Sequence, residues 1–144
     1  MKNSALLAVG LVLVVMALAA CNPIKTFQKR ERLTQLNSVV NIYRKLMRWG
    51  HYDQAAQYLK ARDDSPMLPD FKAMSRYKVS SYTIADQIFS DTDFEAKITA
   101  YVDFYNIDTG VALSLRDEQF WWYDEQEKRW NLGSPMMNFS SVSN

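Results

Sequence analysis

The chain has 144 residues, of which 48% are apolar and 23% are charged, and its formal net charge is +1. This length and composition are typical of one folded domain and exclude wholesale disorder. One cysteine and one histidine exclude a disulfide framework and any multi-cysteine or multi-histidine metal site within the chain. Four glycines leave no glycine-rich phosphate loop, so we expect no cofactor and no bound metal.

The first twenty residues have the pattern of a secretory signal peptide. A short start with Lys2 precedes an uncharged stretch from Ser4 to Ala20, whose strongly apolar part is shorter than the roughly 20 residues that span a bilayer. The ending Leu18-Ala19-Ala20-Cys21 resembles the lipobox of bacterial lipoproteins. The resemblance implies cleavage between Ala20 and Cys21 and acylation of the Cys21 thiol and amino terminus. The alternatives are an ordinary signal peptide with a chance cysteine, or an uncleaved anchor.

The anchor and the residue after it indicate a location. Buried acyl chains contribute about 0.8 kcal/mol per methylene, so several chains anchor a protein permanently. In Gram-negative lipoproteins, Asp after the cysteine retains the protein in the inner membrane, so Asn22 favours the outer membrane. We therefore expect a protein on the periplasmic face of the outer membrane. Its partners there are the membrane, through the lipid, and an envelope protein, whereas nucleic acid is not expected.

Charge is distributed unevenly along the mature chain. From Cys21 to Trp49 there are seven basic residues and one acid, whereas from Gly50 onward there are nine basic and fifteen acidic residues. Anionic headgroups would attract the basic part at roughly 1 kcal/mol per well-placed Lys or Arg. The alternative is a solvated helix face whose charges pair with acids of the domain.

A long amphipathic helix is predicted at the start of the mature chain. After a short tether over residues 21–26, apolar residues recur over 27–49 at steps of three and four, with no glycine or proline between them. Gly50 suits the C-terminal cap of this helix. The apolar stripe consists of Leu33, Leu36, Val40, Tyr43 and Met47.

Shorter helical segments follow. Asp53 can cap a helix over residues 54–62. Pro69 and Asp70 can open one further turn near residues 71–74. Helical periodicity then stops.

Strand patterns occupy the second half of the chain. β-branched and aromatic residues predict a strand over 77–89, and residues 94–104 alternate between apolar even positions and polar odd ones. The turn Asp108-Thr109-Gly110 leads into a strand over 111–123, with a bulge near Asp117-Glu118 that lets the faces switch.

Residues 129–132 are predicted to start a last strand, which Pro135 limits to a sheet edge or ends, and the tail over 140–144 is expected to be frayed. The fold class is therefore α+β, in a single domain over 27–139. Its long helix and a shorter helix pack on a curved antiparallel meander of about four strands.

Two stretches of sequence are informative together: Tyr43-x-x-x-Met47-Arg48-Trp49-Gly50-His51-Tyr52-Asp53-x-Ala55-Ala56 and Trp122-Tyr123-(six residues)-Trp130-x-Leu132. They resemble bacterial lipoproteins with a nuclear transport factor 2-like, or cystatin-like, α+β roll. The resemblance implies a bent sheet with a cone-shaped cavity, in which some members of the superfamily carry acid–base residues. Apart from His51, no histidine exists here to complete a His–Asp dyad.

Aromatic residues crowd the last hairpin. Neighbours on a strand point to opposite faces, so one of Trp121 and Trp122 must face away from the core. An outward indole beside Tyr123, opposite Trp130, predicts a partner-binding surface, because aromatic anchors dominate binding energy at protein interfaces. The alternative is cross-strand packing that holds the hairpin together.

Polar residues of the second strand are the candidates for a cavity. Asp103 shares a face with Tyr101 and Tyr105, and this face would line the cavity unless the apolar face supplies the core. His51 could act as a general base with Asp53 or Asp103, or it could simply occupy a helix–helix corner.

A third candidate site is acidic. Asp91, Asp93 and Glu95 could offer oxygens to calcium, although their spacing also suits a hairpin turn. The absence of a second histidine, a free nucleophilic cysteine and a metal motif leads us to expect no catalytic residues. The favoured function is a lipid-anchored binding or envelope-assembly module that faces the periplasm. The alternative is a cavity-containing small-ligand carrier or acid–base enzyme.

Overall fold

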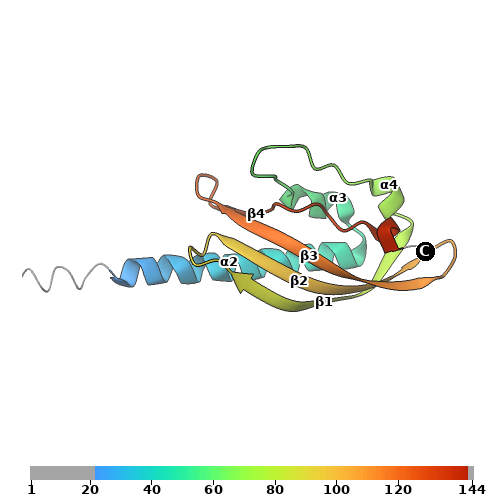
Figure 1. Ribbon diagram of the computed structural model, residues 1–144, viewed down its shortest axis with the longest axis horizontal. Helices are drawn as coiled ribbons and strands as arrows, with labels where there is room; N and C mark the ends of the chain where they lie inside the picture. Colours follow the sequence, from blue (N-terminus) through green and yellow to red (C-terminus); the bar gives the residue numbers. More distant parts are fainter. Residues whose placement is uncertain (1–21, 143–144) are drawn as a thin grey trace, which may run out of the picture. The chain divides into compact units, whose positions relative to one another are not determined.

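The computed structural model describes residues 22–142 (Figure 1), so the predictions at Ala20 and Cys21 lie outside the described residues. The chain divides into two compact units, one ending at Thr34 and the other beginning at Gln35. Helix α2 spans Asn22–Trp49 and begins five residues earlier than predicted, because Pro23 falls in the first turn, where its missing N–H has no helical partner to lose. Within the described residues, no helix is long and apolar enough to cross a bilayer.

The part of α2 that belongs to the second unit packs its apolar stripe against the sheet. Leu36, Val40, Tyr43 and Met47 are buried at the predicted steps of three and four residues. The helix ends at Gly50, which has φ +75°, as its N–H donates to the Met47 carbonyl and the next N–H donates to Leu46. This pair of hydrogen bonds is the glycine-dependent helix ending that the sequence predicted.

The second helix is much shorter than predicted. Helix α3 spans Tyr52–Ala55 and continues only as the 3-10 turn η1, Ala56–Tyr58. The residue before α3 is His51 and not Asp53, and its side chain makes no cap hydrogen bond. Helix formation stops because the chain becomes extended at Leu59 and bridges to Leu132, where the Lys60 N–H donates to the Leu132 carbonyl at 3.0 Å.

The third helical turn is where the sequence predicted it. Helix α4 spans Phe71–Met74, and the Asp70 carboxylate accepts a hydrogen bond from the Ala73 N–H at 2.9 Å. This is the N-terminal capping for which Asp is suited.

The four strands form one antiparallel sheet in the order β1-β2-β3-β4, which confirms the predicted α+β class and meander (Figure 1). The strands are β1 Tyr77–Phe89, β2 Glu95–Asn106, β3 Ala112–Asp124 and β4 Arg129–Leu132. The bulge predicted near Asp117-Glu118 is wrong, because β2 and β3 pair without a register shift. The irregularities lie in β1, at residues 79–81 and 84–86, where they can bend the sheet.

The inner face of β2 supplies the centre of the core. Its even-numbered residues from Ala96 to Phe104 are buried, and most of its odd-numbered residues are exposed, as predicted. On β3 the alternation continues unbroken, so Asp117, Gln119 and Trp121 all point inward. The consequence is that two polar side chains occupy core positions.

The described part of the C-terminal segment includes one short helical turn. Residues 140–142 belong to the 3-10 turn η2, Phe139–Val142, which Figure 1 shows close to α4. Phe139 is buried and its ring centroid lies 4.9 Å from that of Phe104 and 5.3 Å from that of Tyr77. This aromatic contact holds the residue before the predicted tail against the sheet, and residues 143–144 lie outside the described residues.

Candidate functional site

The aromatic hairpin is not the exposed surface that the sequence predicted. Trp121 is 0% exposed, and its ring lies edge-on to Tyr43 with centroids 5.6 Å apart. Trp130 is also buried in the core, and Tyr123 is half-buried between Trp130 and Phe94. Two of the four candidate partner-binding residues are therefore inaccessible, because the sheet is covered on the face toward which they point.

Trp122 points to the opposite face, but it too is partly covered. Its indole N–H donates to the Lys60 carbonyl at 2.8 Å, and the cationic groups of Lys60 and Arg62 lie within 6 Å of its ring. A Cβ at Gly133 would come within 2.9 Å of the Trp122 ring, so only glycine leaves room for this packing. The prediction of a substantially exposed indole is wrong, since residues 60–62 lie over it.

The predicted cavity residues lie on the solvent-facing side of the sheet. Tyr101 is 54% exposed, and Asp103 and Tyr105 are exposed beside it on the outer face of β2. The Asp103 carboxylate accepts a hydrogen bond from the Ser114 hydroxyl at 2.6 Å, on the neighbouring strand. The apolar face of β2 forms the core, and this leaves the polar face in solvent.

Most of the other titratable candidates are exposed. His51 lies in the turn before α3 and Asp53 lies within α3, and both are exposed. In the hairpin between β1 and β2, Asp91 is exposed, whereas Asp93 is buried and has φ +58°, as expected of a turn residue. Glu95 is half-buried and forms an ion pair with Arg62. Among residues 22–142 there is no group of three or more His, Cys, Asp or Glu side chains that could hold a metal ion.

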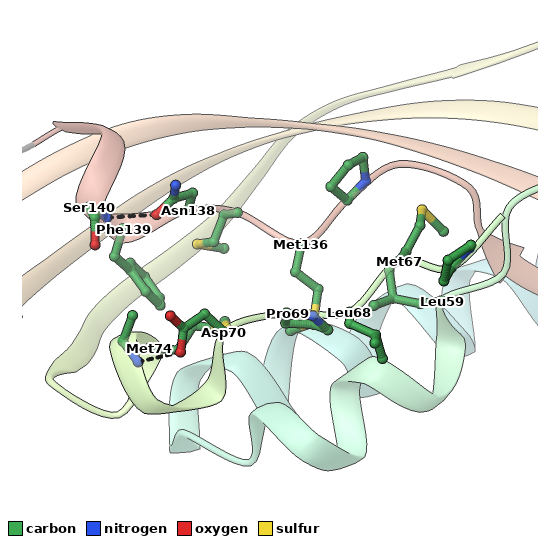
Figure 2. A pocket seen from close by; sticks show the side chains of 14 residues that line it. Leu59, Met67, Leu68, Pro69, Asp70, Met74, Met136, Asn138, Phe139 and Ser140 are labelled. Carbon is green, nitrogen blue, oxygen red and sulfur yellow. Dashed lines mark hydrogen bonds between the residues drawn. The ribbon is translucent and has the colours of Figure 1, made fainter.

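A pocket lies where no candidate was predicted, between two irregular segments that are far apart in the sequence. Residues 66–70 form one wall and residues 135–140 form the other, and the volume is about 590 Å³. Figure 2 shows the Met136 side chain extending from one wall toward Pro69 on the other. Leu59, Ala73 and Met74 complete the lining. We call this site the Met–Pro pocket.

The lining of the Met–Pro pocket is dominated by methionine and proline. Four of the seven methionines and three of the four prolines of the chain contribute to it. Leu68, which also lines the pocket, is 90% exposed and so presents apolar surface to water. The methionines and prolines of the lining are Met67, Met74, Met136, Met137, Pro66, Pro69 and Pro135.

The sequence does contain a signal for this pocket. The pair Pro-Met occurs twice, at Pro66-Met67 and at Pro135-Met136, in stretches with neither helical nor strand periodicity. Each pair places a flexible apolar side chain on irregular backbone, but only the fold brings the two pairs to one place.

A second feature that the sequence did not predict is a buried polar cluster beneath α2, which we call the Asp117 cluster. Asp117 is 6% exposed, and one carboxylate oxygen accepts hydrogen bonds from the Tyr82 hydroxyl at 3.0 Å and the Gln119 amide at 2.6 Å. The Gln119 amide also donates to the Tyr82 hydroxyl, and the Gln119 carbonyl accepts from the Trp121 indole at 2.8 Å. The buried Tyr43 hydroxyl has no hydrogen-bond partner among the residues that the structure describes.

Burial controls the ionisation of the Asp117 cluster. Desolvation raises the pKa of the Asp117 carboxyl, against the hydrogen bonds from Gln119 and Tyr82, which lower it. Desolvation, followed by the nearby Asp117 charge, raises the pKa of Tyr43 and of Tyr82 as well. The cluster is not part of the Met–Pro pocket, whose lining contains none of its members.

Replacing Asp117 with Asn tests this assignment. A carboxyl whose pKa is raised in the folded state keeps its proton while the unfolded chain loses it, so stability falls as pH rises from about 4 toward the folded pKa. We expect urea unfolding of the natural chain to show this decline. D117N should lack the decline and should be more stable at pH 7 by about 1–3 kcal/mol. The exposed control D103N should keep the pH profile, and an identical profile for both variants would contradict the assignment.

The structure thus separates the predicted site residues from the pocket. None of Trp121, Trp122, Tyr123, Trp130, Tyr101, Asp103 and Tyr105 lines the Met–Pro pocket. The apolar lining, the irregular backbone of both walls and the exposed Leu68 are the features from which a function must be inferred. Comparisons with protein-family models, with curated proteins and with solved structures give no match for this chain.

Proposed function

We propose that the protein is a lipid-anchored binding module on the periplasmic face of the bacterial outer membrane, and that it takes up an apolar ligand in the Met–Pro pocket. Lipidation at Cys21 and the outer-membrane location are carried by the lipobox-like sequence and by Asn22. We also propose that the domain is a nuclear transport factor 2-like roll, because its order of helices and strands resembles that of the roll.

The observation that carries the ligand-binding part is the composition of the pocket. Methionine side chains are flexible and polarizable, so a methionine-lined surface can adapt to the shape of an apolar ligand. The volume of about 590 Å³ lies in the range of roughly 300–1,000 Å³ typical of ligand sites. Leu68 adds apolar surface that a ligand would remove from water.

The proposal includes no catalytic step. Asp70 is the one ionisable side chain in the pocket lining, and its carboxylate already accepts the hydrogen bond that caps α4. General acid–base chemistry requires a titratable group within hydrogen-bond reach of the reacting proton, usually with a second group to orient it. The pocket supports binding better than it supports turnover.

Photolabelling tests the binding site. The purified mature protein, in phosphatidylcholine nanodiscs, is irradiated with an uncharged alkyl amide that carries a diazirine, and labelled peptides are mapped by mass spectrometry. We expect labels in residues 66–70 and 135–140, and about tenfold less label in Leu68→Ser, because that change removes apolar contact area. The matched control is Ile88→Ser, at an exposed residue of β1 outside the pocket lining. Equal labelling of Leu68→Ser and of the natural chain would contradict the proposal.

Intact-mass analysis tests the anchor. We expect the membrane fraction to contain a chain that starts at Cys21 and carries added acyl mass, since the lipobox-like sequence directs cleavage before the cysteine. Cys21→Ser should lack the acyl mass and accumulate with residues 1–20 attached. A soluble, unmodified natural chain that retains residues 1–20 would overturn the proposed location.

A further inference from the structure

We infer that the ligand of the Met–Pro pocket is a short, extended apolar peptide segment with a basic side chain, such as an exposed segment of an envelope protein. This inference rests on the proposed function and specifies its ligand. Three features of the pocket favour a peptide over an acyl chain. They are the unpaired backbone groups in both walls, the methionine and proline side chains of the lining, and the negative charge of Asp70.

Part of the backbone of each wall is open to hydrogen bonding, although the carbonyls of Pro69, Asp70 and Asn138 already accept hydrogen bonds. Within residues 22–142, no group forms a hydrogen bond with the backbone N–H or C=O of Met67, Leu68, Met136 or Met137. Met136 and Met137 are nevertheless mostly buried. Backbone groups away from bulk water are nearly always paired in proteins, so unpaired groups along an apolar pocket suit a ligand that carries donors and acceptors of its own. An extended peptide has such groups at every residue, whereas an acyl chain has none along its length.

The side chains of the pocket match this mode of binding. Proline at 66, 69 and 135 removes N–H groups at intervals, and residues 65–70 and 135–138 form neither helix nor strand. An extended ligand projects alternate side chains to opposite sides, and the methionines can close around side chains of different shape. Such a pocket selects apolar residues without demanding one particular sequence.

The negative charge of Asp70 in the lining favours a ligand that carries a positive charge. Asp70 is exposed at the pocket, and it uses Oδ1 to accept the Ala73 N–H (Figure 2). The remaining carboxylate oxygen has no partner among the described residues. A free fatty acid would bring a second carboxylate toward this charge, whereas a Lys or Arg side chain would be attracted to it.

The test uses defined peptides and the full mature protein in phosphatidylcholine nanodiscs, with empty nanodiscs as the blank. The probe is acetyl-Leu-Val-Lys-Leu-Val-amide with a dye on a glycine spacer, followed by fluorescence anisotropy. The first comparison peptide has the same side chains but N-methyl groups on its backbone nitrogens. The second has Glu in place of Lys, and an uncharged decyl amide serves as the acyl competitor.

We expect the parent peptide to bind saturably and the N-methylated peptide to bind at least tenfold more weakly, because N-methylation removes the donors that pair with the walls. Leu68→Ser should weaken binding of the parent peptide about tenfold, and Ile88→Ser should leave it unchanged. The Glu peptide should bind several-fold more weakly than the Lys peptide. Asp70→Asn keeps the capping oxygen but removes the charge, so in that variant the Lys and Glu peptides should bind equally.

The remaining outcomes separate this inference from the proposed function. If the N-methylated peptide binds as tightly as the parent and decyl amide competes with both, the ligand is an acyl or other apolar group. The peptide inference is then overturned while the proposed function stands. If neither the peptides nor decyl amide bind, and photolabelling is equal in Leu68→Ser and the natural chain, both are overturned.

Discussion

Replacing Trp121 with alanine is expected to lower the free energy of unfolding by about 3–5 kcal/mol, the range for truncating a large aromatic side chain in a core. Trp121 is fully buried, contacts the rings of Tyr43 and Tyr58, and donates its indole N–H to Gln119. The truncation would leave a cavity and an unpaired buried carbonyl, and both are destabilising. Urea unfolding followed by far-UV circular dichroism measures the loss.

The adjacent residue provides the matched control. Trp122→Ala should cost less, about 1–3 kcal/mol, because the indole is half-buried and loses one hydrogen bond together with its contacts to Lys60 and Arg62. The two substitutions remove the same side chain from successive positions on one strand. A larger loss for Trp122 than for Trp121 would mean that the faces of β3 are assigned in reverse.

Replacing Val40 with Asp is expected to destabilise the protein by about 4 kcal/mol at pH 7, which is among the largest effects of a single substitution. Val40 is 3% exposed in the stripe of α2 that faces the sheet, so the new carboxylate would be buried without a partner. Burial favours the protonated form of such a carboxyl, and the loss should therefore shrink as pH falls toward 4. Chemical unfolding at pH 4 and at pH 7 measures both effects.

Lys45→Asp is the control for this substitution, because it places the same side chain on the same helix at an exposed position. It should change stability by about 0.5 kcal/mol or less. Arg44 is unsuitable for this purpose, since it is half-buried. Equal losses in Val40→Asp and Lys45→Asp would show that the stripe of α2 is not the buried face.

These variants also separate packing from binding. Trp121 and Val40 act through the core, whereas Leu68 is exposed and can be changed with little effect on the free energy of unfolding. A loss of ligand binding in Leu68→Ser, with unfolding unchanged, would therefore report on the pocket alone. The Asp117 cluster belongs with the core, because its hydrogen bonds join β1 to β3 beneath α2.

Local pattern was sufficient for much of the fold. Strand β1 has the predicted bounds, the alternation of β2 assigns every one of its apolar side chains to the core, and Gly50 ends α2 as expected. These features depend on the periodicity of neighbouring residues or on the backbone freedom of a single glycine, so the sequence contains them directly. The open antiparallel order follows as well, because short turns join each strand to the next.

Tertiary structure decided the remainder. The helix after Tyr52 stops early because β4 pairs with the chain at Leu59, and Asp117 is buried because β2 holds β3 in an unbroken register. The prediction of function at the aromatic hairpin assumed that crowded aromatics must reach solvent, but one face is buried beneath α2 and the other is covered by residues 60–62. The Met–Pro pocket joins residues 66–70 to residues 135–140, and no local pattern encodes that pairing. Its position depends on how Phe139 packs against Tyr77 and Phe104, which is a contact between distant parts of the chain.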